Sequence, residues 1–129
     1  MKRKFNSLNS LKSRFLSFKH AFDGIKILLK EEPNFRIHLG VSILVILLGI
    51  IVRISVTEWL IVCLLIALVL SLEAINTAIE NLCDFVSPEW DEKIKRIKDI
   101  AAASVLVAAL ISIVCGIIIF LPKIILVLH

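Results

Sequence analysis

The sequence predicts an all-α integral membrane protein, with one amphipathic surface helix followed by three transmembrane helices. Of its 129 residues, 59% are hydrophobic and 20% are charged, and the mean hydropathy is +0.97. A soluble domain of this size buries only about two-thirds of its surface, so it would leave much of this apolar material in water. Three spans of about 20 residues each use roughly half of the chain. The remainder is too short for a separate soluble catalytic domain, so we expect residues 1–129 to form a single membrane domain.

The first predicted element is an amphipathic helix over residues 10–32. Apolar residues recur there at steps of three and four, and basic residues lie mostly between them. This pattern is typical of a helix that lies on a membrane surface. The apolar positions are Leu11, Phe15, Phe18, Phe22, Ile25 and Leu29. Pro33 disfavours a helical conformation for the residue before it, so we expect a break ahead of the first span.

Three apolar segments follow, and each is long enough to cross a bilayer. The expected spans are residues 35–54, 59–79 and 100–121. Arg36 and Arg53 flank an uncharged stretch, and their long side chains can reach the two interfaces. The short polar stretch 53–58 predicts a tight connection, so the first two spans form a helical hairpin. Pro122 and Lys123 are expected to end the third span.

Residues 80–98 are expected to connect the second and third spans on the cytoplasmic side. Ser87, Pro88 and Glu89 predict a turn, with Pro88 at the first position of a charged helix that leads into Lys98.

The distribution of charge predicts the orientation. Residues 1–36 contain nine Lys or Arg against three acids, and a second basic cluster lies at residues 93–96. Basic residues near spans favour the cytoplasmic side, which puts the N-terminus inside and, after three spans, the C-terminus outside. The basic pI of 9.2 is explained by anionic lipid, so no nucleic-acid partner is expected. The three cysteines are odd in number and form no CxxC pair, which favours neither a disulfide framework nor a zinc site.

One polar stripe interrupts the second span. An ionisable residue inside an apolar span costs about 2.5–3.5 kcal/mol on insertion scales, and Glu73 is such a residue. At about 100° per residue, Asn76, Thr77, Glu80 and Asp84 all lie within about 60° of Glu73 on the helix. A polar partner helix, a bound metal or a water-filled site would offset this cost. A polar seam between helices therefore remains open beside a catalytic site.

The number of acidic groups favours a site. Glu73 and Glu80 are two turns apart, about 10 Å along the axis, which is too far to share one ion but suits two roles along a substrate. Carboxylates are ligands for Mg²⁺, which also binds phosphate oxygens. The same membrane face also collects Glu31, Glu32, Lys98 and Asp99. Phosphoryl transfer uses this set of groups. With four glycines in the whole chain, a glycine-rich nucleotide loop is excluded.

Two segments resemble a known family. Residues 73–84, with the sequence EAINTAIENLCD, are followed by Lys98-Asp99 and the small-residue run 101–104, and this arrangement resembles the prokaryotic diacylglycerol kinase family. Residues 32–38, with the sequence EPNFRIH, resemble its Gram-positive branch, the undecaprenol kinases. The similarity covers about residues 15–123. It implies a homotrimer of three-span subunits that phosphorylates a membrane lipid alcohol with ATP and Mg²⁺, at the cytoplasmic face of a bacterial plasma membrane.

The resemblance also implies a role for each motif residue. Glu73 corresponds to the general base that accepts the proton of the lipid hydroxyl. Glu32 and Glu80 correspond to the Mg²⁺ ligands that hold the ATP phosphates. The implied nucleotide contacts are Asn76, Lys98 and Asp99, together with Glu32 and Glu80.

Several alternatives stay open at this point. Undecaprenol, converted to undecaprenyl phosphate, is the expected substrate, and diacylglycerol, converted to phosphatidic acid, is the alternative, because both present one hydroxyl at the interface. A non-catalytic accessory or ion-binding membrane protein is the alternative of a different class. Asp84 fits the motif, but it also fits a helix cap or an ion pair with a cytoplasmic lysine. His20 and His38 have no predicted partner.

Overall fold

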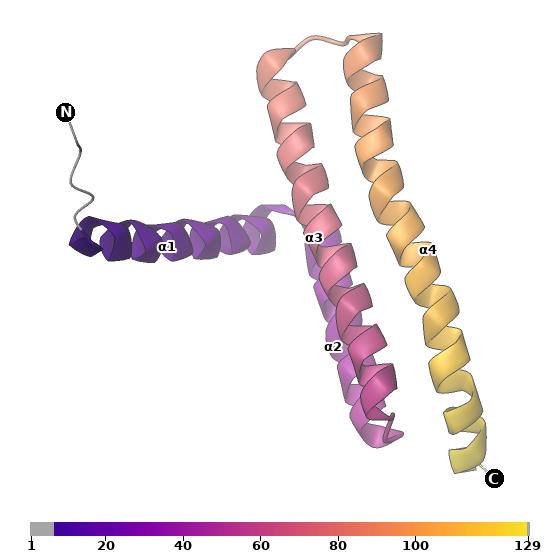
Figure 1. Ribbon diagram of the computed structural model, residues 1–129. Helices are drawn as coiled ribbons and strands as arrows, with labels where there is room; N and C mark the ends of the chain where they lie inside the picture. Colours follow the sequence, from indigo (N-terminus) through magenta and orange to yellow (C-terminus); the bar gives the residue numbers. More distant parts are fainter. Residues whose placement is uncertain (1–6, 129) are drawn as a thin grey trace. The chain divides into compact units, whose positions relative to one another are not determined.

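The computed structural model describes residues 7–128, with side chains from Ser13 onward. This part of the chain forms four helices, α1 (Ser7–Glu31), α2 (Pro33–Ile51), α3 (Val56–Val86) and α4 (Glu92–Leu128) (Figure 1). The last three are long and apolar enough to cross a membrane. The prediction of an all-α chain with three candidate membrane spans is therefore confirmed for the residues that the structure describes. The chain divides into two units, one ending at Pro33 and one beginning at Asn34.

The first unit contains α1, so the prediction that this segment is helical is confirmed. The described apolar side chains at its steps of three and four are exposed, from Phe15 at 75% to Leu29 at 38%. The side chain of Leu11 lies outside the described residues. The position of this apolar face on a membrane surface stays a prediction. The break at Pro33 is confirmed, because α1 ends at Glu31 and Pro33 begins α2, where its missing N–H costs no helical hydrogen bond.

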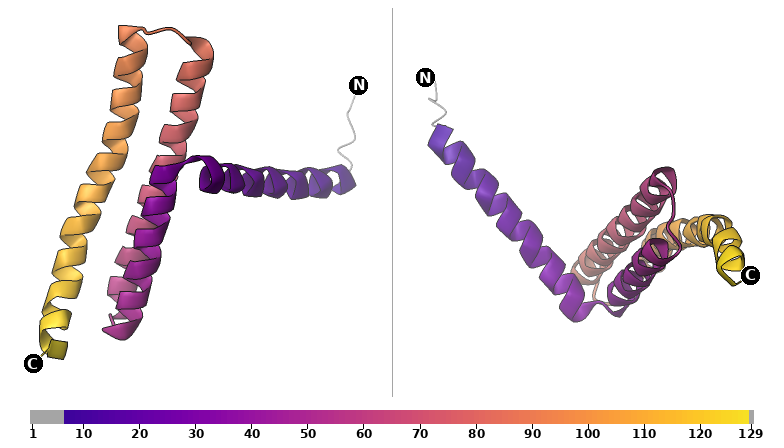
Figure 2. Two further views of the ribbon diagram at one scale, coloured as in Figure 1. Left: turned by 180° about the vertical axis from the view of Figure 1, so that it is seen from behind. Right: turned by 90° about the horizontal axis from the view of Figure 1, so that it is seen from below.

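The second unit begins with the predicted hairpin of α2 and α3, which residues 52–55 connect. Ser55 caps α3, because its hydroxyl accepts from the Glu58 N–H while the Glu58 carboxylate accepts from the Ser55 N–H at 2.6 Å. Gly49 is buried beside Trp59, and a Cβ added to Gly49 would lie 2.9 Å from the Trp59 ring. Glycine at this position therefore leaves room for the Trp59 ring beside α2. Figure 2 shows this hairpin of two helices from two further sides.

Helices α3 and α4 pack antiparallel, with an ion pair near each end (Figures 1 and 2). Glu58 pairs with Lys123 at 3.1 Å, and Asp84 pairs with Lys98. In an antiparallel pair of helices, residues that face each other have a constant sum of residue numbers. The sums here are 181 and 182, so α3 and α4 keep the same register from one ion pair to the other. The buried residues of α4 in its first half are small or β-branched, namely Ala101, Val105 and Ala108. Small residues let the helix backbones approach closely.

Two expectations about helix ends are wrong. Pro88 lies in the connection and not in a helix, since α4 begins at Glu92. The carboxylate of Asp91 provides the cap, accepting from the Lys93 and Ile94 N–H groups at 2.7 and 3.2 Å. Pro122 does not end α4, which continues to Leu128. An internal proline removes only one helical hydrogen bond, so the helix can continue past it through the apolar residues 124–128.

Candidate functional site

The polar stripe on α3 turns from buried to exposed along the helix. Glu73, Asn76 and Thr77 are 3%, 6% and 5% exposed. Glu80 is half-buried, and Asp84 is exposed. Helical spacing alone predicted that these residues share one face, and the structure confirms it. Glu73, the most buried residue of the stripe, lies about 26 Å along the helix axis from the start of α3. The hydrocarbon layer of a bilayer is about 30 Å thick, so Glu73 would lie near its far side if α3 entered the layer at its first residue.

Small residues on α4 explain why this polar face is covered. The register set by the two ion pairs places Glu73 opposite Ala108, which is 2% exposed. It also places Asn76 opposite Val105 and Glu80 opposite Ala101. The structure therefore encloses the Glu73 carboxylate between helices instead of exposing it to lipid, which is the arrangement expected of an ionisable group in a span.

Asn76 links the buried and the half-buried parts of the stripe. Its Nδ2 donates to Glu80 Oε1 at 2.9 Å, which orients that carboxylate. Its Oδ1 is buried and accepts no hydrogen bond from the described residues. Leaving a buried acceptor unpaired costs about 1–3 kcal/mol, so a donor from a ligand or a second chain would stabilise this group.

Lys98 lies opposite the exposed end of the stripe, in the polar first turns of α4, before the apolar segment begins at Ile100. It forms an ion pair with Asp84, which is one of the alternatives that the sequence left open for Asp84. The hydrogen bond to the Asp84 carboxylate raises the pKa of Lys98 above its usual value, so Lys98 stays a cation. The neighbouring Asp99 instead pairs with Lys95 at 2.8 Å on the exposed side of α4.

The predicted magnesium ligands lie in different units. Glu32 follows α1 in the first unit and is half-buried, whereas Glu80 belongs to the second unit. Their convergence on one ion stays a prediction. Among the described residues no group of three or more His, Cys, Asp or Glu side chains is placed to hold a metal. Mg²⁺ bound to a nucleotide needs only one or two carboxylates besides the phosphates, and the Glu80 carboxylate, which no described Lys or Arg pairs with, fits that requirement.

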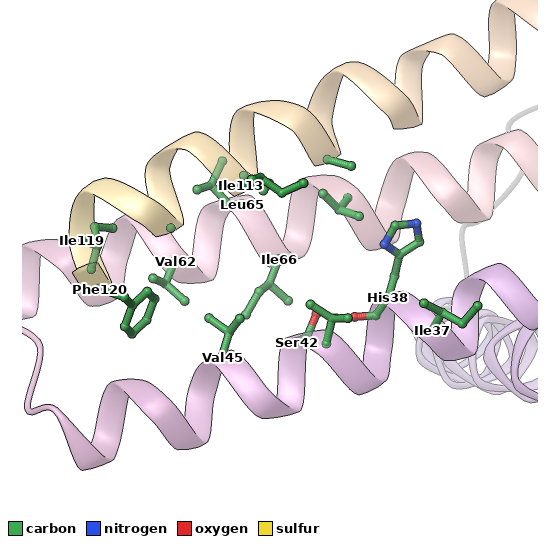
Figure 3. Close-up of a pocket in the computed structure, with 15 residues that line it drawn as sticks. Ile37, His38, Ser42, Val45, Val62, Leu65, Ile66, Ile113, Ile119 and Phe120 are labelled. Atoms are coloured by element: carbon green, nitrogen blue, oxygen red, sulfur yellow. The ribbon is translucent and has the colours of Figure 1, made fainter. Parts of the chain in front are cut away.

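A feature that the sequence did not reveal is an apolar groove of about 350 Å³ enclosed by α2, α3 and α4 (Figure 3). His38 and Ser42 of α2 line it together with Val69 of α3, one turn from Glu73. Sequence analysis assigned His38 no role. One sequence feature could have indicated the groove. His38 and Ser42 are one turn apart in an otherwise apolar segment, which places both on one face of the helix.

Comparisons with known proteins show the family of the chain. The family model described as prokaryotic diacylglycerol kinase matches residues 19–120, which include the whole stripe and Lys98. Over 115 residues the chain is 42% identical to an undecaprenol kinase of Bacillus subtilis, covering 89% of this chain and 94% of that protein. Over 108 residues it is 32% identical to a diacylglycerol kinase of Synechocystis sp., covering 83% of this chain and 62% of that protein. The chain therefore belongs to the prokaryotic diacylglycerol kinase family and is a lipid kinase.

Proposed function

We propose that this lipid kinase transfers the γ-phosphoryl group of ATP to the hydroxyl of undecaprenol, giving undecaprenyl phosphate and ADP. The observation that carries the proposal is a 3% exposed carboxylate, Glu73, one turn from the end of an apolar groove. The 42% identity to an undecaprenol kinase supports this substrate. Diacylglycerol, converted to phosphatidic acid, is the second candidate, supported by the Synechocystis relative. Family membership favours a kinase over the non-catalytic alternative.

In this proposal Glu73 is the general base. The lipid oxygen forms a bond to the γ-phosphorus while the bond from that phosphorus to the β,γ-bridging oxygen breaks, and ADP leaves with that oxygen. The proton of the lipid hydroxyl passes to the Glu73 carboxylate. A positioned base of this kind contributes about 10²–10⁴-fold to the rate. Burial of Glu73 against α4 also keeps water from replacing the lipid as acceptor.

Glu80 and Glu32 would hold Mg²⁺ on the ATP phosphates, where the ion neutralises phosphate charge. Asn76 orients the Glu80 carboxylate, and the cationic Lys98 lies one turn further along, paired with Asp84. We assign nucleotide contacts to Asn76, Lys98 and Asp99. Glu80 lies about 10 Å along the helix from Glu73, toward its exposed end. This order suits a hydroxyl that arrives from the bilayer and a nucleotide that arrives from water.

The proposal includes an assembly and an orientation. The working form is a homotrimer in the bacterial plasma membrane, with α1 on its inner surface, the N-terminus and the site cytoplasmic, and the C-terminus outside. The excess of basic residues in the first 36 supports this orientation. The buried Asn76 Oδ1 supports completion of the site by a ligand or by another subunit. The number three rests on the family resemblance.

The test is phosphate transfer by the purified protein in mixed micelles. Radiolabelled ATP and Mg²⁺ are supplied with undecaprenol or with diacylglycerol at equal mole fraction. We expect labelled undecaprenyl phosphate, formed faster than phosphatidic acid, and no product when Mg²⁺ is chelated. Transfer to diacylglycerol alone would favour the second candidate, and transfer to neither lipid would refute the proposal.

A further inference from the structure

We propose that the amide carbonyl of Asn76 accepts a hydrogen bond from Glu73 once Glu73 has taken the proton of the lipid hydroxyl, and that this bond stabilises the transition state of phosphoryl transfer. Asn76 is then a positioning residue that acts through the proposed base, in addition to its proposed nucleotide contact. This inference rests on the proposed function and deepens it, because it concerns the proton that the reaction releases.

Glu80 fixes the orientation of the Asn76 amide. Nδ2 of Asn76 donates to Glu80 Oε1 at 2.9 Å, toward the C-terminal end of α3. The reverse orientation would place the Asn76 carbonyl against the carboxylate, where both groups only accept. Oδ1 is therefore directed away from Glu80, which leaves the preceding turn of α3, with Glu73, and the facing surface of α4.

The facing surface of α4 has no donor for this oxygen. The register set by the two ion pairs places Val105 opposite Asn76, and its side chain is apolar. The hydroxyl of the adjacent Ser104 already donates to the Ala101 carbonyl at 2.6 Å. The backbone N–H groups of this segment are used inside the helix. On α3, Glu73 lies three residues before Asn76 on the same face, which is a spacing at which helix side chains meet.

The protonation state of Glu73 decides whether it can donate to Oδ1. An ionised carboxylate only accepts, whereas a protonated one has an O–H group. During transfer the lipid oxygen bonds to the γ-phosphorus, ADP leaves with the bridging oxygen, and the lipid proton moves to Glu73. The new O–H group then donates to Asn76 Oδ1. The proton stays on Glu73 in this hydrogen bond and returns to water before the next lipid reacts.

The hydrogen bond therefore forms only as the reaction proceeds. Before transfer, Oδ1 belongs to a side chain that is 6% exposed and accepts nothing from the described residues, which is unfavourable for a buried acceptor. Proton transfer to Glu73 relieves this condition. An interaction that is stronger in the transition state than in the ground state raises the rate of the chemical step instead of tightening substrate binding.

Asn76→Leu tests this bond, because leucine is similar in size and has no hydrogen-bonding side-chain atom. Thr77→Val is the matched control, since Thr77 is the next residue, is 5% exposed and loses one polar group. The measurement is the single-turnover rate of transfer to undecaprenol as a function of pH, at saturating ATP and Mg²⁺. We expect Asn76→Leu to lower the plateau rate at least about fivefold and to move the acidic limb of the profile about one to two pH units lower. Thr77→Val should keep the parental limb and a rate within about twofold of the parent.

The other titratable groups around Glu73 in the second unit are the same in both variants. They are Glu80 on α3 and Arg36 and His38 on α2, and residues 100–112 of α4 contain none. A limb that moves in Asn76→Leu alone would therefore report the amide. If Asn76 only orients Glu80, the variant should need more Mg²⁺ while its acidic limb stays in place, and that result would overturn the proposal.

Infrared spectroscopy tests the bond without turnover and on the parent protein. In acid, the C=O stretch of protonated Glu73 is the band that is missing from Glu73→Gln. A hydrogen-bonded carboxylic acid absorbs at lower wavenumber than a free one, so the band should be low in the parent and higher in Asn76→Leu. A parent band at the position of a free acid would overturn the proposal, even if Asn76→Leu did not assemble. Failure of the parent protein to phosphorylate any lipid alcohol would instead refute the proposed function.

Discussion

Replacing Gly49 with alanine should loosen the hairpin of α2 and α3. The added Cβ would lie 2.9 Å from Trp59 Cη2 and 3.1 Å from Ile54 Cδ1. Carbon atoms in contact normally keep about 3.5–4.0 Å, so both neighbours would have to move. Ile54 belongs to the apolar cluster at this end of the second unit, and Trp59 packs against that cluster, so movement of either one disturbs the packing of α4 as well.

The magnitude follows from a comparison with Gly40→Ala. Overpacking of a well-packed site costs about 1–3 kcal/mol. Both substitutions gain about 1 kcal/mol from the better helix propensity of alanine. Gly40 has no atom within 4 Å of an added Cβ, so it gains the propensity without the overpacking. The free energy of unfolding of Gly49→Ala should therefore be lower than that of Gly40→Ala by about 1–3 kcal/mol.

The assay is reversible unfolding in mixed detergent micelles, followed by the fluorescence of Trp59. Trp90, which is exposed in the connection between α3 and α4, is replaced by phenylalanine in all variants so that one fluorophore remains. Equal free energies of unfolding for the two alanine variants would refute the close packing of Trp59 on Gly49.

Three further substitutions test the site and its surroundings. Glu80→Gln should raise the Mg²⁺ concentration needed for half-maximal transfer at least about tenfold, and an unchanged Mg²⁺ dependence would argue against Glu80 as a ligand. Lys98→Met should raise the KM for ATP at least about tenfold, whereas Lys93→Met, which removes an exposed lysine from the first turn of α4, should change it by less than about twofold; similar effects would refute the assignment. Glu58→Gln keeps a capping side chain but loses the ion pair to Lys123, so the midpoint of thermal unfolding should fall less than it does in Gly49→Ala, and an equal or larger fall would show that this pair is a major anchor.

The sequence predicted the ends of helices correctly where a single local feature determines them. Pro33 marked the break before α2, and the polar stretch after Arg53 marked the hairpin connection. Pro88 suits a first helical position, and on that basis the start of the helix was placed too early. In the structure Asp91 caps α4, which begins at Glu92. Pro122 predicted the end of the last helix, but a proline removes only one helical hydrogen bond and the apolar residues after it continue α4.

The polar stripe was predictable because helical spacing alone puts Glu73, Asn76 and Glu80 on one face. The burial of these residues was not predictable, because it depends on how α4 is aligned with α3. That alignment is set by ion pairs of Glu58 and Asp84 with residues far away in the sequence. The groove was missed for the same reason, since three helices contribute to it and no single segment carries its pattern.

The role of Glu73 is the central claim, and phosphate transfer by Glu73→Gln tests it most directly. The matched control is Glu89→Gln, which removes one carboxylate from the exposed connection between α3 and α4. We expect Glu73→Gln to lower the rate of transfer to undecaprenol at least about 100-fold while the oligomer and ATP binding are retained, and Glu89→Gln to keep the parental rate. A Glu73→Gln rate within about twofold of the parent would contradict the assignment of Glu73 as the general base.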